Sequence, residues 1–511
     1  MGIVYSPMKQ VRIHNKLDRA LEMVPGFLTW VVLTSPLWLS LNLPFMMAYG
    51  IIFLDVYWLY RAIKSGLFSV IGYKSYIRNL HVLWWDKLLA DFPQTHSDIE
   101  HILIIPTYKE PEYVIRSTLK GIASSVYDLS HVRVILALEE REDDVLKLAK
   151  KNVAAEYSSV FANVYVTEHP STIEGEVVGP GSNRTWSVKS LWEKLDTDIN
   201  IDNTILTTLD ADFVIHPQFL AGLTHKYLST ENVKQKSFTG VFIYSNNYWQ
   251  APAPMRIIAS SHTINQLAEL VEPWKYVIFS SHSLNLRTLS EVGFWSSDHV
   301  NDDSRLYWTA LYHFKGDFEV LPHWMPIYAD TVLDSTWSTT YVNQYKQLQR
   351  WAYGVEHRPF IYKKTLTETH IPLGRRIERL LFVVRADLIW STIAYITGFG
   401  SLLLVTVNPY FRETVLGTNL VFYSGAILTF AIVGLMPTAY LNHKLFSPMP
   451  KDWSIFHKII GNVQLLLTPL VLMTFGSIPA IDAQTRLMLG KYLSFRVTLK
   501  HRNKVVDDTR S

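Results

Sequence analysis

The stretch TILTTLDADFVIHP, residues 204 to 217, runs from a short apolar segment directly into two carboxylates one residue apart. Its Ile, Leu and Thr residues favour a strand, whereas aspartate is disfavoured inside a sheet. Asp210 and Asp212 are therefore predicted to stand where the strand ends. Two hard oxygen donors at a sheet edge suit a divalent cation that bridges the phosphates of a nucleotide. The alternative is a solvated turn or a cap for the following helix.

Similar strands recur between residues 98 and 355. The strand-like segments are HILIIPTY (101–108), HVRVILALEE (131–140) and NVYVTEH (163–169), and polar helical stretches follow at 141–156 and 184–196. Alternation of strands and helices predicts an α/β domain with a mostly parallel sheet. Functional side chains of such sheets gather at the carboxyl ends of the strands, which is where Asp210 and Asp212 stand.

The composition indicates that part of the chain lies in lipid. Hydrophobic residues make up 48% and charged residues 18% of the 511, and there are 16 Trp and 27 Tyr. Soluble domains carry about a quarter charged residues, and aromatic rings collect at membrane interfaces. The net charge of +3 gives no indication of nucleic acid as a partner. Without cysteine, a metal would be held by Asp, Glu or His, which favours Mg²⁺ or Mn²⁺.

The apolar residues gather towards both ends of the chain. Residues 24–60 are long enough for two short spans that meet at Asn42–Pro44, and 387–407 and 419–441 each fit one span. Basic residues flank the first pair on both sides, so both flanks are predicted to be cytoplasmic. A further stretch, 459–480, is interrupted by two prolines and a glycine. We interpret it as re-entrant or interfacial, with a straight span as the alternative.

Three more segments carry residues suited to chemistry. They are DHVNDDSRLYW with Asp302 and Asp303, QYKQLQRWAYG with Gln347, Arg350 and Trp351, and FRVTLK at 495–500. An aspartate here could act as a general base or cap a helix, and Arg beside Trp can bind phosphate and stack on a sugar ring. The alternatives for the last two are an arginine that reaches the membrane interface and a contact with lipid head groups.

The order PTYKE, DAD, NDD, QLQRW and FRVTLK, between membrane spans, resembles the processive family 2 glycosyltransferases of the cellulose synthase and hyaluronan synthase type. The resemblance covers about residues 20 to 505, and its specific parts are QLQRW and FRVTLK. It implies a GT-A type, Rossmann-like α/β domain on the cytosolic side, flanked by transmembrane helices. It also implies a multi-pass protein of the plasma membrane.

The implied organisation has seven parts. They are a cytosolic segment (1–23), two transmembrane helices (24–62), a cytosolic linker with an interface helix (63–97), the GT-A domain (98–355), interfacial helices (356–386), transmembrane helices with the re-entrant segment (387–480), and a cytosolic tail (481–511) that contains the gating-loop-like FRVTLK.

Carried over residue by residue, the resemblance implies a donor site, a metal site, a base and an acceptor site. The donor nucleotide would be bound by Pro106, Thr107, Tyr108, Glu110, Glu139, Glu140, Asn183, Asp210, Arg350, Thr498 and Lys500. Asp210 and Asp212 would hold Mg²⁺ or Mn²⁺, Asp303 would be the base, and Gln347, Arg350 and Trp351 would contact the diphosphate and the acceptor. Ser283 and Arg287, from SSHSLNLRTLSEVGFW (280–295), would lie on the acceptor side with Trp351.

Three departures from the family pattern leave details open. The usual T-E-D reads Asn301–Asp302–Asp303, so Asp302 is the alternative base. Glu139 and Glu140 stand where the family has aspartate. The lysine that precedes the metal strand is absent, and Asn183 and Arg184 are the nearest polar candidates.

The expected activity is inverting transfer from a nucleotide-diphosphate sugar, with UDP as the expected nucleotide, onto a growing β-linked polysaccharide, together with its export. One alternative is transfer of a single sugar to a polyprenyl phosphate or another lipid acceptor. Another is a transporter or channel with a cytosolic ligand-sensing domain. The sugar, the linkage and the oligomeric state do not follow from the sequence.

Overall fold

Strand β4 (Thr204–Thr208) lies inside an eight-stranded mixed sheet with the order β3-β2-β1-β4-β7-β6-β8-β5. The computed structural model describes residues 15–434, 436–446 and 448–495. The other strands are β1 (Glu100–Pro106), β2 (Val132–Glu139), β3 (Asn163–His169), β5 (Val214–Ile215), β6 (Lys236–Ile243), β7 (His282–Asn285) and β8 (Glu319–Tyr328). All five residues of β4 are buried, which explains its apolar, β-branched composition.

The strand directions differ between the two halves of the sheet. Strands β3, β2, β1 and β4 are parallel to one another, as predicted. Strand β7 is antiparallel to both β4 and β6, β5 is antiparallel to β8, and β6 and β8 are parallel. The sheet is therefore mixed, and the expectation of a mostly parallel sheet holds only for its first four strands.

Helices cover both faces of the sheet. One face is covered by α4 (Glu112–Ala123), α5 (Asp144–Glu156) and α8 (Phe219–Leu228), and the other by α6 (Pro180–Ser190), α7 (Trp192–Asp198), α9 (Ala253–Glu269), α10 (Leu286–Glu291) and α11 (Asp302–His313). Successive residues of β1 point to opposite faces, so Leu103 and Ile105 enter one core and Ile102 and Ile104 the other. The predicted α/β class is confirmed.

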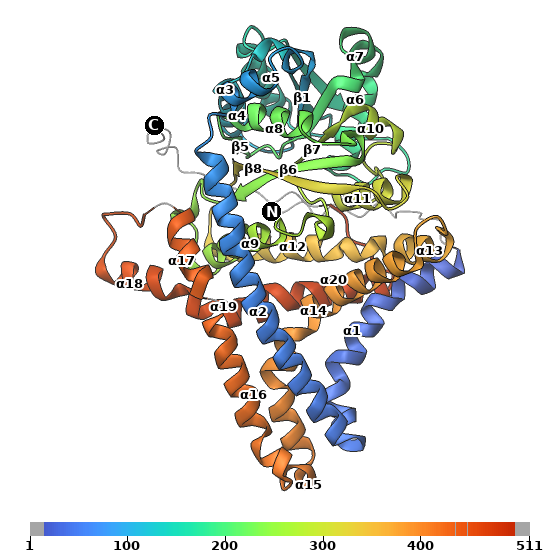
Figure 1. Ribbon diagram of the computed structural model, residues 1–511, viewed down its shortest axis with the longest axis vertical. Coiled ribbons are helices and arrows are strands. Elements are labelled where there is room, and N and C mark those ends of the chain that lie inside the picture. The colour runs from blue at the N-terminus through green and yellow to red at the C-terminus, as the bar shows by residue number, and fades with distance from the viewer. Residues whose placement is uncertain (1–14, 435, 447, 496–511) are drawn as a thin grey trace.

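Long apolar helices lie at both ends of the chain and form the lower half in Figure 1. Five segments are long and apolar enough to cross a membrane: Lys16–Asn42 (α1), Pro44–Leu80 (α2), Leu373–Val407 (α14), Val415–Leu445 (α16, Val415–Val433, with α17, Met436–Leu445) and Ile455–Met488. Helices α1 and α2 meet at Leu43, within the predicted junction. The short helix α15 (Pro409–Arg412) connects α14 to α16.

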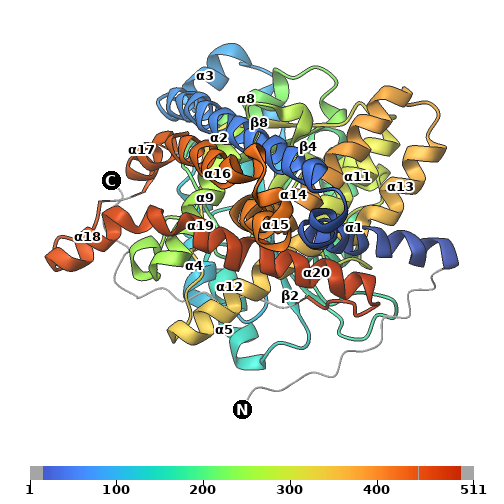
Figure 2. The ribbon, with the colours of Figure 1, turned by 90° about the horizontal axis from the view of Figure 1, so that it is seen from below.

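The last apolar segment is bent. It consists of α18 (Ile455–Val463), a 3-10 turn (Gln464–Leu467), α19 (Thr468–Val471), a π-helical turn (Leu472–Ser477) and α20 (Ile478–Met488). Figures 1 and 2 show this segment running across the boundary between the two halves, where α20 packs against α1 and α12. Its placement in or along a membrane stays a prediction.

The two halves are joined mainly through α2 and the elements near the boundary. Helix α2 has 37 residues, and its upper part packs on α9 and β8, where Tyr76 enters the core of the α/β half. The remaining elements are α3 (Trp84–Asp91), α12 (Trp337–Ala352), a 3-10 segment (Tyr353–His357) and α13 (Arg358–Thr367). Helix α12 lies between the sheet and α20.

Candidate functional site

The DAD turn follows β4 at its carboxyl end, between β4 and β5. The amide of Phe213 donates to the carbonyl of Asp210 (2.9 Å), and the Thr118 hydroxyl donates to the carbonyl of Ala211 (2.7 Å). Asp212 is 7% exposed and accepts a hydrogen bond from the amide of Asp330 (3.1 Å), whereas Asp210 is half-buried. Hydrogen bonds from the Thr118 hydroxyl and the Asp330 amide therefore hold the turn in place, and its two carboxylates stand at a sheet edge.

Ser280 joins Asp210 to Asp303. Its hydroxyl donates to Asp210 Oδ2 (2.8 Å), and its amide donates to Asp303 Oδ2 (2.6 Å). The residue has φ +56°, a left-handed conformation that is uncommon for serine. This conformation lets one residue hold two carboxylates that would otherwise repel each other.

Asp302 and Asp303 have different surroundings although they are adjacent. Asp302 is 3% exposed and accepts a hydrogen bond from the Arg184 guanidinium, which also donates to Thr208 Oγ1 (2.8 Å). Burial raises the pKa of Asp302 to about 6, and the charge of Arg184 opposes this. Asp303 is half-buried and accepts a second amide hydrogen bond from Ser304 (2.7 Å). Of the two, Asp303 is the one that a ligand can reach.

The close approach of α6 to Asp302 depends on a glycine. A Cβ atom at Gly181 would lie 2.5 Å from Asp302 Cβ and 2.9 Å from the carbonyl oxygen of Ser296. The first turn of α6 therefore packs directly against the start of α11.

Arg350, near the end of α12, lies among the acidic side chains. Burial lowers the pKa of the Arg350 guanidinium, and the charges of Asp303, Asp210 and Asp302 oppose this. The guanidinium carbon lies 4.6 Å from the centre of the Phe495 ring. Its Nε is buried and has no hydrogen-bond partner within the part of the chain that the structure describes. A cation in this position can bind an anionic ligand at the DAD turn.

The segment after Arg350 holds the loop that carries Asp303. Glu356 Oε1 accepts hydrogen bonds from the amides of Val300 (2.9 Å) and Asn301 (3.0 Å). The Asn301 side chain donates to the carbonyl of Arg350 (3.0 Å). The base candidate and the cation are thus fixed relative to each other through the backbone.

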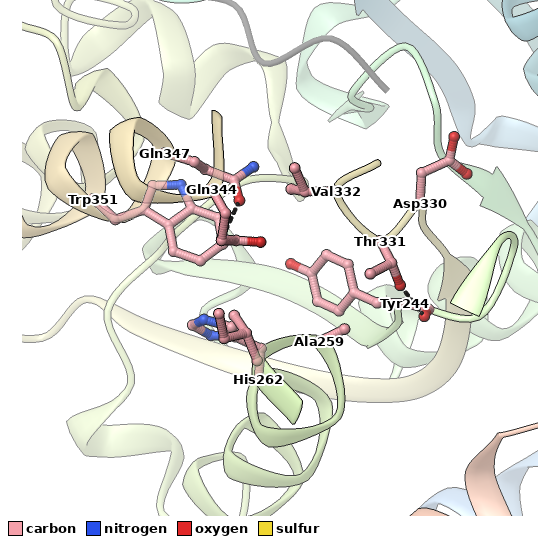
Figure 3. A pocket seen from close by; sticks show the side chains of 10 residues that line it. Tyr244, Ala259, His262, Asp330, Thr331, Val332, Gln344, Gln347 and Trp351 are labelled. Atoms are coloured by element: carbon pink, nitrogen blue, oxygen red, sulfur yellow. Dashed lines mark hydrogen bonds between the residues drawn. The ribbon is translucent and has the colours of Figure 1, made fainter. Parts of the chain in front are cut away.

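A small cavity lies beside Trp351, between α9 and α12 (Figure 3). Its polar lining comprises the hydroxyl of Tyr244, the imidazole of His262, the amides of Gln344 and Gln347, which are hydrogen-bonded to each other (3.1 Å), and the side chains of Asp330 and Thr331. His262 and Trp351 pack edge to face with ring centres 4.8 Å apart. Burial lowers the pKa of His262 to about 4, so the imidazole is neutral near pH 7. The cavity is about 20 Å³, which is room for about one water molecule, so in this group it is the Trp351 ring that suits contact with a sugar.

A second group of polar residues stands at the carboxyl ends of β1 and β2. Glu110 accepts hydrogen bonds from the Thr107 hydroxyl (2.8 Å) and the Tyr108 amide (2.6 Å). Lys150 is fully buried, donates to Thr107 (2.9 Å) and pairs with the equally buried Glu142 (2.6 Å). Burial raises the pKa of Glu110, and Lys150 opposes this. Pro106 ends β1 directly before this group.

The two glutamates at the end of β2, Glu139 and Glu140, already have partners. Glu139 is 6% exposed and pairs with Arg141, whose guanidinium lies 4.1 Å from the centre of the Tyr108 ring. Glu140 is exposed and accepts hydrogen bonds from the amide (2.7 Å) and hydroxyl (2.8 Å) of Ser171. Glu139 therefore lies beside the Tyr108 group, and Glu140 is bound to the loop that follows β3.

Several residues with expected site roles lie elsewhere. Ser283 is buried inside the sheet, where its hydroxyl shares a hydrogen bond with Thr207 (2.7 Å). Arg287 pairs with Asp202 (3.0 Å), at the opposite end of β4 from Asp210. Asn183 is 1% exposed and donates to the carbonyl of Ala137 (2.9 Å), so it fixes α6 to β2. Thr498 and Lys500 lie outside the described residues.

The DAD carboxylates fit a divalent cation that takes further ligands from a bound diphosphate. The pKa of Tyr244 is raised by burial and then by the charges of Asp210 and Asp212. Across 15–434, 436–446 and 448–495, no three His, Asp or Glu side chains are grouped to hold a metal ion. Mg²⁺ commonly uses one or two carboxylates together with phosphate oxygens and water, and two carboxylates meet that need.

Four residues near the site were not predicted from the sequence. Ser280 begins the segment SSHSLNLRTLSEVGFW, whose pattern indicates no role for it, and the sequence indicates Arg184 only as a substitute for the lysine of the family pattern. Glu142 and Glu356 gave no signal beyond being acidic. Their roles depend on backbone geometry and, except for the Glu142–Lys150 pair, on partners far away in the sequence.

No protein family matches the chain, and no curated protein is significantly similar to it in sequence. Among solved structures, it is similar to the mannosyltransferase PcManGT from Pyrobaculum calidifontis, in complex with GDP-Man and Mn²⁺. The TM-score is 0.42 at 13% identity, over 84% of this chain and 98% of that one. Residues 1–349 of S. aureus TarS, in complex with UDP-GlcNAc, give a TM-score of 0.34 at 12% identity, over 78% of this chain and 94% of that one.

Proposed function

We propose that the protein is a membrane-bound, inverting glycosyltransferase that uses a nucleotide-diphosphate sugar to extend a β-linked polysaccharide. The observation that carries the proposal is the meeting of Asp210, Asp303 and Arg350 at the carboxyl edge of the sheet. A reachable carboxylate, a second carboxylate at a metal-compatible turn and a half-buried cation are what transfer from a diphosphate requires.

In this proposal Asp303 takes the proton from an acceptor hydroxyl. The acceptor oxygen forms a bond to the anomeric carbon, and the bond from that carbon to the diphosphate oxygen breaks, with its electron pair leaving on the diphosphate. Arg350 stabilises the negative charge that develops there. Mg²⁺ or Mn²⁺ bound by Asp210 and Asp212 would neutralise diphosphate charge.

The acceptor is proposed to lie on the Trp351 side. Attack from the face opposite the diphosphate inverts the anomeric centre, so an α-linked donor gives a β-glycoside. The Trp351 ring would stack on the acceptor sugar while Asp303 faces its hydroxyl. The groups around Thr107, Tyr108 and Glu110 would face the nucleotide.

The α/β half is proposed to be cytoplasmic, and the apolar helices to carry the product across the plasma membrane.

The test is a screen of nucleotide sugars with the purified protein and Mn²⁺ or Mg²⁺, scored by nucleotide release and product length. Release that depends on Asp303, with a long product, supports the proposal. If the product is a lipid phosphate that carries a single sugar, the acceptor is a lipid and the proposed polysaccharide product is wrong. Asp202→Asn is the matched control, because Asp202 lies at the opposite end of β4. If none of the donors releases its nucleotide in a metal-dependent manner, the proposed transferase activity is contradicted.

A further inference from the structure

A cleft of about 510 Å³ lies away from the candidate active site, between the α/β half and the start of α14. Its walls come from the ends of the α/β elements, including Lys236, Trp274 and Tyr312, and from the first turns of α14, with Arg375, Arg376 and Arg379. The volume falls within the range of small-molecule sites, about 300 to 1,000 Å³. The candidate active site gives this cleft no role.

The charges of the cleft are not balanced. Its acidic residues Asp317 and Glu319 already pair with Arg375 (3.4 Å) and Lys236 (2.9 Å). Glu378 is exposed at the rim.

Among the residues that the structure describes, the guanidinium groups of Arg376 and Arg379 donate hydrogen bonds only to backbone carbonyls. Arg376 donates to the carbonyl of Thr365 (2.7 Å), and Arg379 donates to the carbonyl of Trp274 (2.6 Å). Within the described part of the chain, neither forms an ion pair with a carboxylate, and Arg376 Nε is buried without a hydrogen-bond partner. Two guanidiniums in one cleft with spare donors suit an anion with several oxygen atoms.

The helix itself favours an anion at this point. Pro372 precedes α14, and no side chain caps its first amides. The start of a long helix carries a partial positive charge and unpaired amide groups. Arg379 precedes Asp387, where the predicted span begins, by eight residues, or about 12 Å along the helix. That distance places the cleft at the depth of lipid head groups in the proposed membrane arrangement.

We propose that this cleft binds a phosphate group, through Arg376 and Arg379, beside the indole of Trp274. The phosphate belongs either to an anionic lipid head group or to a soluble phosphate compound. Binding would join α14 to the α/β half, because the cleft is lined from both. The proposal does not depend on the glycosyltransferase assignment, and its test needs no turnover.

The test measures binding to the full chain in a neutral detergent by the shift of Tm. The probes are inorganic phosphate, short-chain phosphatidylglycerol and, as the neutral lipid, short-chain phosphatidylcholine. We expect a saturable rise of Tm with phosphatidylglycerol, phosphate or both, and none with phosphatidylcholine. Saturation by phosphate alone identifies a soluble ligand, and a rise only with phosphatidylglycerol identifies a head group.

Arg376→Gln with Arg379→Gln should weaken this binding by roughly tenfold or more, since two charge-assisted contacts are lost. The matched control is Arg385→Gln, on the same helix but away from the cleft, which should leave the affinity unchanged. Arg376→Lys with Arg379→Lys should retain part of the affinity. If the glutamine pair misfolds, Lys236→Gln tests the opposite wall. Equal weakening by Arg385→Gln, or no effect of either cleft variant, would overturn the proposal.

Discussion

The guanidinium of Arg184 donates a hydrogen bond to the carboxylate of Asp302, and both side chains are almost completely buried. This pair occupies the position next to Asp303, which remains half-exposed and faces Ser280. One of two adjacent aspartates is thus committed to the interior, and the other is left for chemistry. Substitutions of Asp302 and Asp303 are therefore expected to have different effects on stability and activity.

Asp303→Asn should lower transfer by at least about 100-fold, because the amide cannot accept the proton of the acceptor hydroxyl. Binding of the nucleotide, measured by calorimetry, should change little. Asp302→Asn should instead lower Tm, since the Arg184 guanidinium would lose its buried counter-charge. Full activity of Asp303→Asn together with inactivity of a folded Asp302→Asn would transfer the role of base to Asp302.

Ser280→Ala should weaken Mn²⁺ binding roughly three- to tenfold, because the hydroxyl that orients the Asp210 carboxylate is lost. Electron paramagnetic resonance of free Mn²⁺ measures this without turnover. Ser280→Gly removes the same hydroxyl but relieves the left-handed backbone, so it should lose the same affinity while folding more stably. Unchanged Mn²⁺ affinity in both variants would show that Ser280 acts on the backbone alone.

Gly181→Ala should displace Asp302, because the new Cβ would lie 2.5 Å from the Cβ of that residue. A loss of about 1–3 kcal/mol in the free energy of unfolding is expected from such overpacking. Gly354→Ala is the matched control near the site, since a Cβ there meets nothing within 4 Å. Equal Tm values for the two variants would mean that α6 can move away from α11.

Stability should fall in mild acid, partly through His282. Burial, together with the charge of Arg184, lowers the pKa of His282 to about 3. The unfolded chain takes up a proton on this residue below about pH 6.5, whereas the folded protein does not until about pH 3. Its contribution is complete above pH 6.5 and decreases as the pH falls, by roughly 1 kcal/mol for each unit below 6.

His282→Gln should therefore make Tm less dependent on pH between 6.5 and 4, whatever its effect at pH 7. The Trp295 indole donates to His282 Nε2 (3.1 Å), so tryptophan fluorescence can follow the same transition. A pH dependence as steep as that of the unchanged protein would exclude His282 as a source of acid sensitivity.

The central strand and the DAD turn could be predicted because each depends on a local pattern: an apolar run that ends in carboxylates defines the sheet edge. A place for Arg350 beside these carboxylates followed only from the family resemblance. The Arg184–Asp302 pair could not be predicted, because its members are 118 residues apart. The left-handed conformation of Ser280 could not be predicted from its residue type, because φ +56° is unusual for serine.

The misplacement of Arg287 has a topological cause. Strand β7 is antiparallel to β4, with His282 opposite Thr208 and Asn285 opposite Ile205. Each residue after His282 therefore moves away from the edge where Asp210 stands. The family motif at 280–295 implies that Arg287 lies on the acceptor side of the site. The direction of β7 instead takes Arg287 to the other edge of the sheet.

The continuity of α2 has a mechanical consequence. Its 37 residues span about 55 Å without a break, and Gly72 approaches the carbonyl of Leu267 so closely that a Cβ there would lie 2.0 Å from it. The helix therefore cannot rotate or slide against α9 without disrupting that contact. A thinner or thicker bilayer that changes the tilt of α2 would carry the whole α/β half with it. Lipid thickness would then set the angle at which the sheet edge faces the membrane surface.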